Sequence, residues 1–166
     1  AAVRSYKDLI SAIAGYDSGS RSISIKLTQL GLDISQELAR DNLYAILTAA
    51  KQSAVEVRID MEGSNVTEQT LALYREASKT FDIVGIVLQA YLRRTREDYE
   101  SILNAGGSVR LCKGAYKEPA AIAFQKMSKI REQYKAELDF GFETVRKNPK
   151  SRLAIATHDD KLINYA

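Results

Sequence analysis

Apolar residues alternate with polar ones, or form a short unbroken run, in segments that are predicted to be β-strands. These segments lie at residues 22–27, 55–60, 83–88, 108–112 and 153–156. The first alternates strictly, with Ile23, Ile25 and Leu27 on its apolar face. The third is almost wholly apolar, as expected for a strand that is covered on both faces of a parallel sheet. The pattern therefore predicts a largely buried sheet.

Between these segments, apolar residues recur at the three- and four-residue spacing of an amphipathic helix. Helices are expected at residues 5–15, 33–51, 66–77, 95–103 and 119–147, with another starting near 161 and turns at 17–20 and 63–65. Asp33 with Gln36, and Thr95 with Asp98, are expected to cap two of the helices. The expected buried stripes include Leu9, Leu38, Ile122 and Met127.

A strand followed by a helix, repeated five times, calls for parallel strands joined by right-handed crossovers. Two α/β architectures satisfy this order, an open doubly wound sheet and a (β/α)8 barrel of the TIM type. No Gly-x-Gly-x-x-Gly motif follows the first strand, which weakens the doubly wound alternative. Each predicted strand instead ends in residues that could bind a ligand, as in barrels. We therefore predict about five β/α units of a (β/α)8 barrel, with residues 1–166 forming a single, partial catalytic domain.

The composition limits the classes of protein to which the chain could belong. Its 166 residues suffice for one domain or a piece of one, and its 45% apolar content excludes a mostly disordered chain. The net charge of +3 is too small to indicate nucleic-acid binding. Cys112 is the single cysteine and is interpreted as a core residue; without a disulfide, the chain suits a reducing, cytoplasmic compartment. No run of about 18 apolar residues indicates a membrane span, so any contact with the inner membrane is expected to be peripheral.

Polar residues at the predicted strand ends suggest chemistry. Lys26, on the first strand, and Asp60, at the end of the second, are expected to be neighbours. They are interpreted either as an ammonium that receives a substrate carboxylate, oriented by the aspartate, or as a structural ion pair. The flat amide of Gln89 suits the edge of a planar heterocycle, and Arg110 would place a positive charge against a centre that gains electrons.

The segment from Arg110 to Pro119 brings two cations, Arg110 and Lys113, next to Gly114, whose missing Cβ lets the backbone approach a ligand. Because Pro119 is expected to open a helix whose first N–H groups lack partners, we expect an anion such as phosphate here. A loop with surface lysines is the simpler interpretation. No metal site is expected, since His158 is the single histidine and no cysteine cluster exists.

Five blocks that include these strand ends carry a family resemblance. They are Ser24–Gly31 (SIKLTQLG), Val57–Ser64 (VRIDMEGS), Gly85–Arg94 (GIVLQAYLRR), Val109–Pro119 (VRLCKGAYKEP) and Ala154–Asp159 (AIATHD). Distributed over nearly the whole chain, they resemble proline dehydrogenase, most of all its monofunctional bacterial type. The resemblance implies an FAD-dependent barrel that oxidises L-proline to Δ1-pyrroline-5-carboxylate. The hydride would pass from proline C5 to flavin N5, and the electrons would then pass to a membrane quinone.

The resemblance also implies roles for particular residues, carried over by position. Lys26 would bind the proline carboxylate, Asp60 would be the catalytic aspartate beside it, and Tyr116 would lie near the substrate. Arg110 would lie against the flavin ring near its reactive nitrogen and favour the anionic reduced form. The other FAD contacts would come from Met61, Gln89, Lys113, Gly114, Ala115, Thr157 and His158.

The chain departs from the family at its C-terminal side. The family continues through three further strands to a last helix whose paired arginines clamp the carboxylate, whereas this chain ends after the fifth predicted strand. Arg93-Arg94 belongs to the third-strand block and cannot play that part. We therefore expect a truncated or partial chain, and a polypeptide that ended at Ala166 is expected to show little or no proline oxidation.

The residues alone also allow two other functions. Lys26 could form a Schiff base in a class I aldolase-like barrel, which borohydride trapping of a carbonyl substrate would support. The open sheet edges of a partial barrel could instead make it an inactive assembly module that associates without bound flavin. A yellow protein with flavin absorbance would favour the flavoenzyme.

Overall fold

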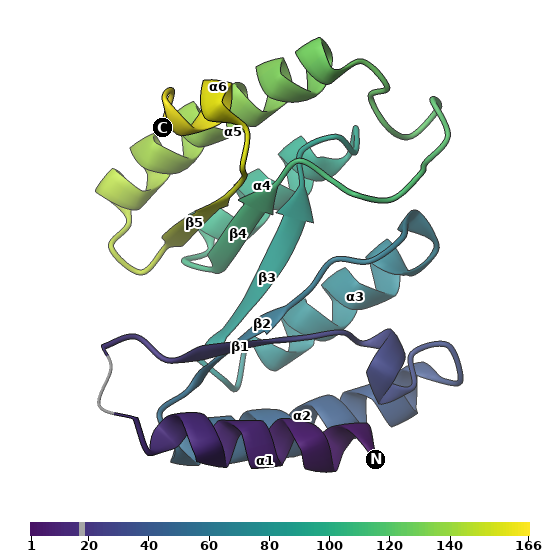
Figure 1. Ribbon diagram of the computed structural model, residues 1–166, viewed down its shortest axis with the longest axis vertical. Coiled ribbons are helices and arrows are strands. Elements are labelled where there is room, and N and C mark those ends of the chain that lie inside the picture. Colours follow the sequence, from purple (N-terminus) through teal and green to yellow (C-terminus); the bar gives the residue numbers. More distant parts are fainter. Residues whose placement is uncertain (17–18) are drawn as a thin grey trace. The chain divides into compact units, whose positions relative to one another are not determined.

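The computed structural model describes residues 1–16 and 19–166, in which five β-strands alternate with helices (Figure 1). The strands form one sheet and follow one another across it in chain order, β1-β2-β3-β4-β5, with parallel pairing. A β/α barrel has this sequential order, whereas a doubly wound sheet reverses direction at a switch point. The predicted α/β class with five β/α units is therefore confirmed.

The chain forms two compact units, residues 1–86 and 87–166, whose border falls within β3 (Val84–Gln89). The first unit contains α1 (Ala2–Ala14), β1 (Ser22–Ile25), a short 3-10 helix η1 (Thr28–Leu30), α2 (Gln36–Gln52), β2 (Glu56–Ile59) and α3 (Ser64–Ala77). The second contains α4 (Thr95–Asn104), β4 (Ser108–Cys112), α5 (Met127–Lys147), β5 (Arg152–Ala156) and α6 (Asp160–Ile163). Within the described part of the chain, no helix has the length and apolar character needed to cross a bilayer.

The core of the first unit follows the predicted alternation, with two exceptions on helices. Ile23, Ile25 and Leu27 are each at most 5% exposed. Leu9 and Leu38 were expected in buried stripes but are 45% and 40% exposed. Each precedes by one position the residue that α1 or α2 buries first, Ile10 or Ala39, and so points to the flank of its helix.

Local caps in the first unit differ from the predicted ones. Ser35, not Asp33, caps α2, since its hydroxyl accepts a hydrogen bond from the Leu38 N–H at 3.1 Å. The expected turn at 63–65 is instead the start of α3, which begins at Ser64. Of the expected turn at 17–20, Asp17 and Ser18 lie outside the described residues.

In the second unit, Thr95 and Asp98 do not form the predicted capping pair. The Thr95 hydroxyl donates to the Gln89 carbonyl at 2.5 Å, and Asp98 pairs with Arg94 at 2.7 Å. Both side chains are buried, so their nearest polar neighbours decide their hydrogen bonds. Tyr134 of α5 is fully buried, and its hydroxyl donates to the Leu111 carbonyl of β4 at 2.8 Å.

The last long helix begins at Met127 rather than at Pro119, so the chain between β4 and α5 is a non-helical loop over residues 113–126. This loop pairs with the β3–α4 loop: Arg93 N–H donates to the Ile122 carbonyl at 2.9 Å and Phe124 N–H to the Tyr91 carbonyl at 2.8 Å. Such pairing uses backbone groups that a helix would need. Ile122 and Met127, expected in a buried stripe, are 39% and 45% exposed.

Candidate functional site

The ends of β1 and β2 bring Lys26 and Asp60 together. Ile25 and Ile59, the last residues of the two strands, lie opposite each other in the parallel register. Lys26 and Asp60 follow them, and the Asp60 N–H donates to the Ile25 carbonyl at 2.8 Å. Their side chains form an ion pair with an Nζ–Oδ2 distance of 2.7 Å. The expected proximity is confirmed, whereas the ligand of this pair stays a prediction.

The alternation predicted that Lys26 lies within the first strand. In the structure, β1 ends at Ile25, and Lys26 is the residue that follows it. Its side chain is 42% exposed, against 19% for Asp60, so the lysine bears no large cost of charge burial. A hydrated ammonium that one carboxylate holds in place is suited to receive an anionic substrate group. It differs from the desolvated amine that Schiff-base lysines use, so the geometry gives no support to the aldolase-like alternative.

Two buried residues follow Asp60 in the chain. Met61, predicted to touch a flavin, is 6% exposed, and that role stays a prediction. Glu62 is 8% exposed, and its carboxylate accepts hydrogen bonds from the backbone N–H and the hydroxyl of Thr28. The β1 and β2 ends are therefore joined at two levels, through Lys26 and through Thr28.

In the second unit, Gln89 ends β3 with a side chain that is 2% exposed. Its Oε1 accepts a hydrogen bond from the Ala115 N–H at 3.4 Å. This bond orients the amide, because the oxygen must face Ala115 and the NH2 group then faces other partners as a donor. Gln89 and Ala115, both predicted to contact a flavin, are thus brought together.

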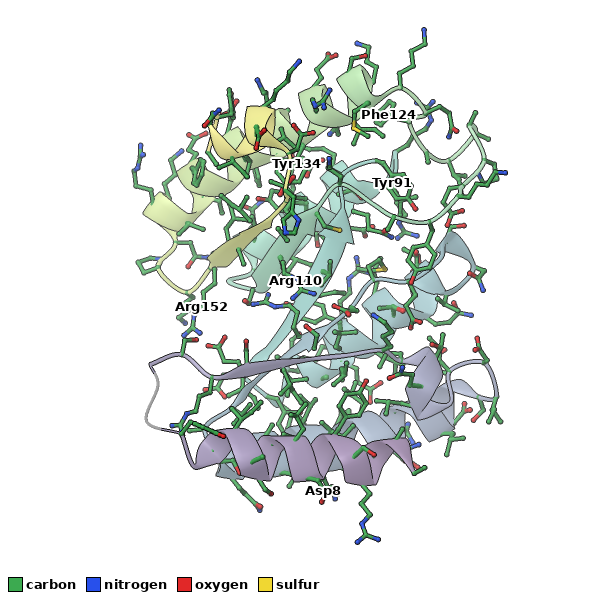
Figure 2. The ribbon with its side chains drawn as sticks, in the orientation of Figure 1. Asp8, Tyr91, Arg110, Phe124, Tyr134 and Arg152 are labelled. Atoms are coloured by element: carbon green, nitrogen blue, oxygen red, sulfur yellow. The ribbon has the colours of Figure 1, made fainter. Side chains whose placement is uncertain are left out.

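Arg110 lies on β4, where side chains alternate between the two faces of the sheet. Val109 and Leu111 are fully buried, whereas Arg110 and Cys112 share the opposite, half-buried face. Figure 2 shows the Arg110 side chain leaving the β4 ribbon. Cys112 was expected to be a core residue but is only partly buried, with its Sγ donating to the Leu88 carbonyl at 3.5 Å. The alternation along β4 therefore places Ser108, Arg110 and Cys112 on the same face.

A buried carboxylate, Asp159, joins the ends of β4 and β5 to α5. Its Oδ2 lies 3.1 Å from Lys113 Nζ and 2.8 Å from Arg131 Nε. The Asp159 side chain is 4% exposed. The hydrogen bond from Arg131, followed by the contact with Lys113, lowers the pKa of Asp159 from 3.8 to about 2. Two cations, Lys113 and Arg131, therefore share this one carboxylate.

Thr157 and His158 form the exit of β5 immediately before Asp159. The Thr157 hydroxyl accepts a hydrogen bond from the Asp159 N–H at 3.1 Å, and Asp159 in turn caps α6 by accepting from the Lys161 N–H at 3.2 Å. His158 is exposed. Through Asp159, Lys113 and the pair Thr157 and His158 are held at the same end of the β4–β5 pair. Their contacts with a cofactor stay predictions.

Gly114 is required by the protein itself, a reason that the sequence did not indicate. Its φ is 115°, and a Cβ at this position would lie 2.2 Å from Cδ1 of Tyr91. Tyr91, labelled in Figure 2, is 6% exposed and fills the space beside the glycine. Tyr116, predicted to lie near the substrate, is 42% exposed. The anion expected at a helix start at Pro119 is not supported, since no helix starts there.

Sequence reasoning missed Glu62, Tyr91, Arg131 and Asp159 as parts of these strand ends. Asp159 carries a detectable signal, because an aspartate just before a helical pattern is a common cap. Arg131 carries none, since it is one of many charged residues on α5. Glu62 and Tyr91 lie within blocks that resemble the family, but their partners are distant in the chain.

Replacing Asp159 by asparagine is expected to destabilise the second unit and to remove one source of acid sensitivity. Because the pKa of Asp159 is lowered in the folded state, its ionised form stabilises the fold fully above its ordinary value of 3.8. That stabilisation is lost as the pH falls through about 2. Urea unfolding between about pH 6 and pH 2 should show a wild-type advantage over Asp159→Asn that shrinks in acid. Asp33→Asn, at an exposed position, is the control, and a pH-independent difference for Asp159→Asn would contradict the assignment.

The sequence is similar to one protein family and to curated proteins. A family model described as proline dehydrogenase matches residues 1–166. Proline dehydrogenase 1 of Bacillus subtilis (strain 168) is 43% identical over 162 residues, which cover 96% of this chain and 51% of that protein. Proline dehydrogenase 2 of the same strain is 38% identical over 158 residues, which cover 94% of this chain and 50% of that protein. The chain spans about half the length of the curated relatives it matches.

Solved structures of proline utilization A share the fold. The protein from Bdellovibrio bacteriovorus, inactivated by N-propargylglycine, matches with a TM-score of 0.85 at 22% identity, over 98% of this chain and 21% of that one. A D779W mutant from Bradyrhizobium japonicum matches with a TM-score of 0.85 at 19% identity, over 98% of this chain and 20% of that one. At such identities the likeness supports the fold alone. The family follows from the match over residues 1–166, which also confirms the predicted resemblance to the monofunctional bacterial type: the chain belongs to the proline dehydrogenase family.

Proposed function

We propose that this chain supplies the substrate lysine and much of the flavin site of an FAD-dependent proline dehydrogenase. When bound, FAD would provide at N5 the acceptor for the hydride that leaves C5 of L-proline, giving Δ1-pyrroline-5-carboxylate, with a membrane quinone as the final electron acceptor. The observation that carries the proposal is the 2.7 Å ion pair between Lys26 and Asp60, at adjacent strand ends of a chain from this family.

On the substrate side, the Lys26 ammonium would bind the carboxylate of L-proline. Asp60 would keep the ammonium in place through the existing ion pair. Tyr116, which is 42% exposed, would line the substrate site. Binding energy at the carboxylate would thereby orient a ring carbon that the protein itself does not attack.

The residues present fit a planar, anionic cofactor. Gln89 has its carbonyl oxygen engaged by Ala115, so its NH2 group would serve as a donor to a flavin ring edge. Asp159 is shared by Lys113 and Arg131, so one carboxylate faces two positive charges. Lys113 would face the diphosphate of FAD. The remaining contacts would come from Met61, Gly114, Thr157 and His158.

Arg110 would act electrostatically. Its positively charged guanidinium would lie against a ring that gains negative charge in the reaction. A fixed charge aimed at developing charge lowers the barrier without reorganisation during the step. Arg110 on β4 and Asp60 after β2 would be the two catalytic residues of this chain.

The proposal is tested by anaerobic titration of the purified, flavin-loaded protein with L-proline, followed as loss of flavin absorbance. Lys26→Met is expected to raise the proline concentration needed by about ten- to hundredfold, the range for one charge-assisted hydrogen bond, with the flavin content unchanged. Lys7→Met, an exposed lysine of α1, is the control and should leave the titration unchanged. A colourless protein, or proline dependence unaltered in Lys26→Met, would refute the proposal.

A further inference from the structure

Beyond the residues assigned above, the first unit contains a carboxylate that fixes the segment bearing Lys26. We infer that Glu62 is a positioning residue for Lys26 and acts through Thr28. It would hold the backbone after β1 where the Lys26 ammonium meets Asp60. The inference rests on the proposed function only in naming L-proline as the ligand of Lys26; the positioning itself depends on the contacts alone.

Glu62 holds Thr28 with both carboxylate oxygens. Oε1 accepts the Thr28 N–H at 3.1 Å, and Oε2 accepts the Thr28 hydroxyl at 2.6 Å. Thr28 is the first residue of η1, where backbone N–H groups lack partners within the helix. Glu62 is 8% exposed, so water competes little for these bonds. The carboxylate therefore caps η1 from the neighbouring strand end.

The pairing of β1 and β2 continues beyond the strands through side chains. Lys26 reaches Asp60, and two residues later Thr28 reaches Glu62, so matching positions are tied on both segments. Leu27, between the two tied residues, is fully buried. The backbone on the C-terminal side of Lys26 is thus held at Leu27 by burial and at Thr28 by its bonds to Glu62.

A tyrosine from α1 holds the same segment from its other side. The Tyr6 hydroxyl accepts the Lys26 N–H at 3.4 Å and donates to Gln29 Oε1 at 2.6 Å. The Asn42 amide donates to the Leu30 carbonyl at 2.9 Å at the end of η1. These bonds make the turn a rigid support for a lysine whose own side chain is 42% exposed.

This support matters because a lysine side chain has many rotamers. With 42% of its side chain exposed, Lys26 is fixed at its tip by Asp60 and at its base by the backbone. If the base moves, the side chain can keep its ion pair with Asp60 only by adopting another rotamer, which changes the direction in which the ammonium points. Preorganised groups lose less conformational entropy when a ligand binds. Loosening the turn should therefore weaken carboxylate binding more than any later step.

The test compares Glu62→Ala and Thr28→Val with their conservative partners Glu62→Gln and Thr28→Ser. The Glu62→Gln variant would keep an acceptor for the Thr28 N–H and place a donor beside the hydroxyl. Hydrogen exchange of the amides from Lys26 to Leu30 and the rate of Lys26 acylation, both read by mass spectrometry, report the positioning without any activity. Glu62→Ala should speed the exchange of these amides by about tenfold. It should also bring the rate of Lys26 acylation close to the rate measured in Asp60→Asn, in which the ion pair is lost. Thr28→Val should show a smaller change, and both conservative variants should behave as wild type.

In the intact, flavin-loaded protein, Glu62→Ala should raise KM for L-proline about tenfold, with kcat changed less than about twofold. Binding of prolinamide, which lacks the carboxylate, should not change. Wild-type exchange and acylation in Glu62→Ala would overturn the inference whatever the activity. If that variant does not fold, the same measurements on Thr28→Val decide. Altered exchange and acylation with unaltered proline binding would support the positioning and refute the proposed carboxylate site instead.

Discussion

Gly114→Ala is expected to lower the unfolding free energy of the second unit by roughly 2–6 kcal/mol. The glycine has φ of 115°, and the added Cβ would lie 2.2, 2.4 and 2.6 Å from three ring atoms of Tyr91. Backbone strain of about 1–3 kcal/mol and overpacking of about 1–3 kcal/mol then act together. Tyr91 cannot move out of the way cheaply, because it is 6% exposed and packs with Leu92, Ala123 and Ile130. Urea unfolding at neutral pH measures the loss.

Two variants separate the strain from the clash. Gly106→Ala has a similar backbone conformation, with φ of 85°, but its nearest contact would be Lys150 Cβ at 3.1 Å, so its loss should be about 1–3 kcal/mol. The single variant Tyr91→Ala should itself be less stable than wild type. In the Tyr91→Ala background, however, the further loss caused by Gly114→Ala should resemble that caused by Gly106→Ala. Equal losses for Gly114→Ala and Gly106→Ala in the wild-type background would show that Tyr91 does not restrict position 114.

The same substitution should also reduce flavin retention under the proposed function. Ala115 follows Gly114 directly, and its N–H is the group that orients the Gln89 amide at 3.4 Å. A shift of the backbone at Gly114 therefore changes the direction of a neighbouring donor as well as the local strain. Gly106→Ala lies at the turn before β4 and should leave the flavin content unchanged.

Much of the fold could be predicted from the sequence because strands and helices have different apolar periods. Ile23, Ile25 and Leu27 identify a strand from the chain alone, and all three are buried. Once five such strands alternate with helices, parallel pairing is nearly unavoidable, and their carboxyl ends lie at one edge of each strand pair. The proximity of Lys26 and Asp60 follows directly from that geometry.

The helix expected from Pro119 shows where local reasoning failed. The segment at 120–124 is rich in residues that favour helices, yet its backbone pairs with Tyr91 and Arg93 in another loop. The Arg93 guanidinium also lies over the Phe124 ring, 4.6 Å from its centroid. Contacts between segments that are distant in sequence outweighed propensity, which contributes less than about 1 kcal/mol per residue.

The residues of the site divide in the same way. Lys113, Gly114 and Ala115 could be named because they follow a strand directly, but the groups that fix them could not. Asp159 reaches Lys113 from 46 residues further along the chain, and α5 brings Arg131 to the same carboxylate. No periodicity encodes such an encounter, since it depends on the path of an irregular loop.

Gly141→Ala in α5 should destabilise the second unit by roughly 2 kcal/mol, although alanine favours a helix over glycine by about 1 kcal/mol. The added Cβ would lie 2.1 Å from the Tyr99 hydroxyl oxygen and 2.7 Å from Leu153 Cδ2. Tyr99 is fully buried on α4 and packs against Phe140, so its ring has little freedom to move. Glycine here permits close approach of α5 to α4 and β5. Urea unfolding of the variant against wild type gives the sign directly.

Tyr99→Phe decides whether that hydroxyl is the obstacle. The Tyr99 hydroxyl is buried without a hydrogen-bond partner in the described part of the chain, so removing it should change stability by less than about 1 kcal/mol. In the Tyr99→Phe background, the nearest ring atom to the new Cβ would be the ring carbon at 3.2 Å, which leaves Leu153 as the main contact. The double variant should therefore recover about half or more of the loss caused by Gly141→Ala. Stabilisation by Gly141→Ala alone would mean that helix propensity dominates at this position and that α4 and α5 yield more readily than their packing implies.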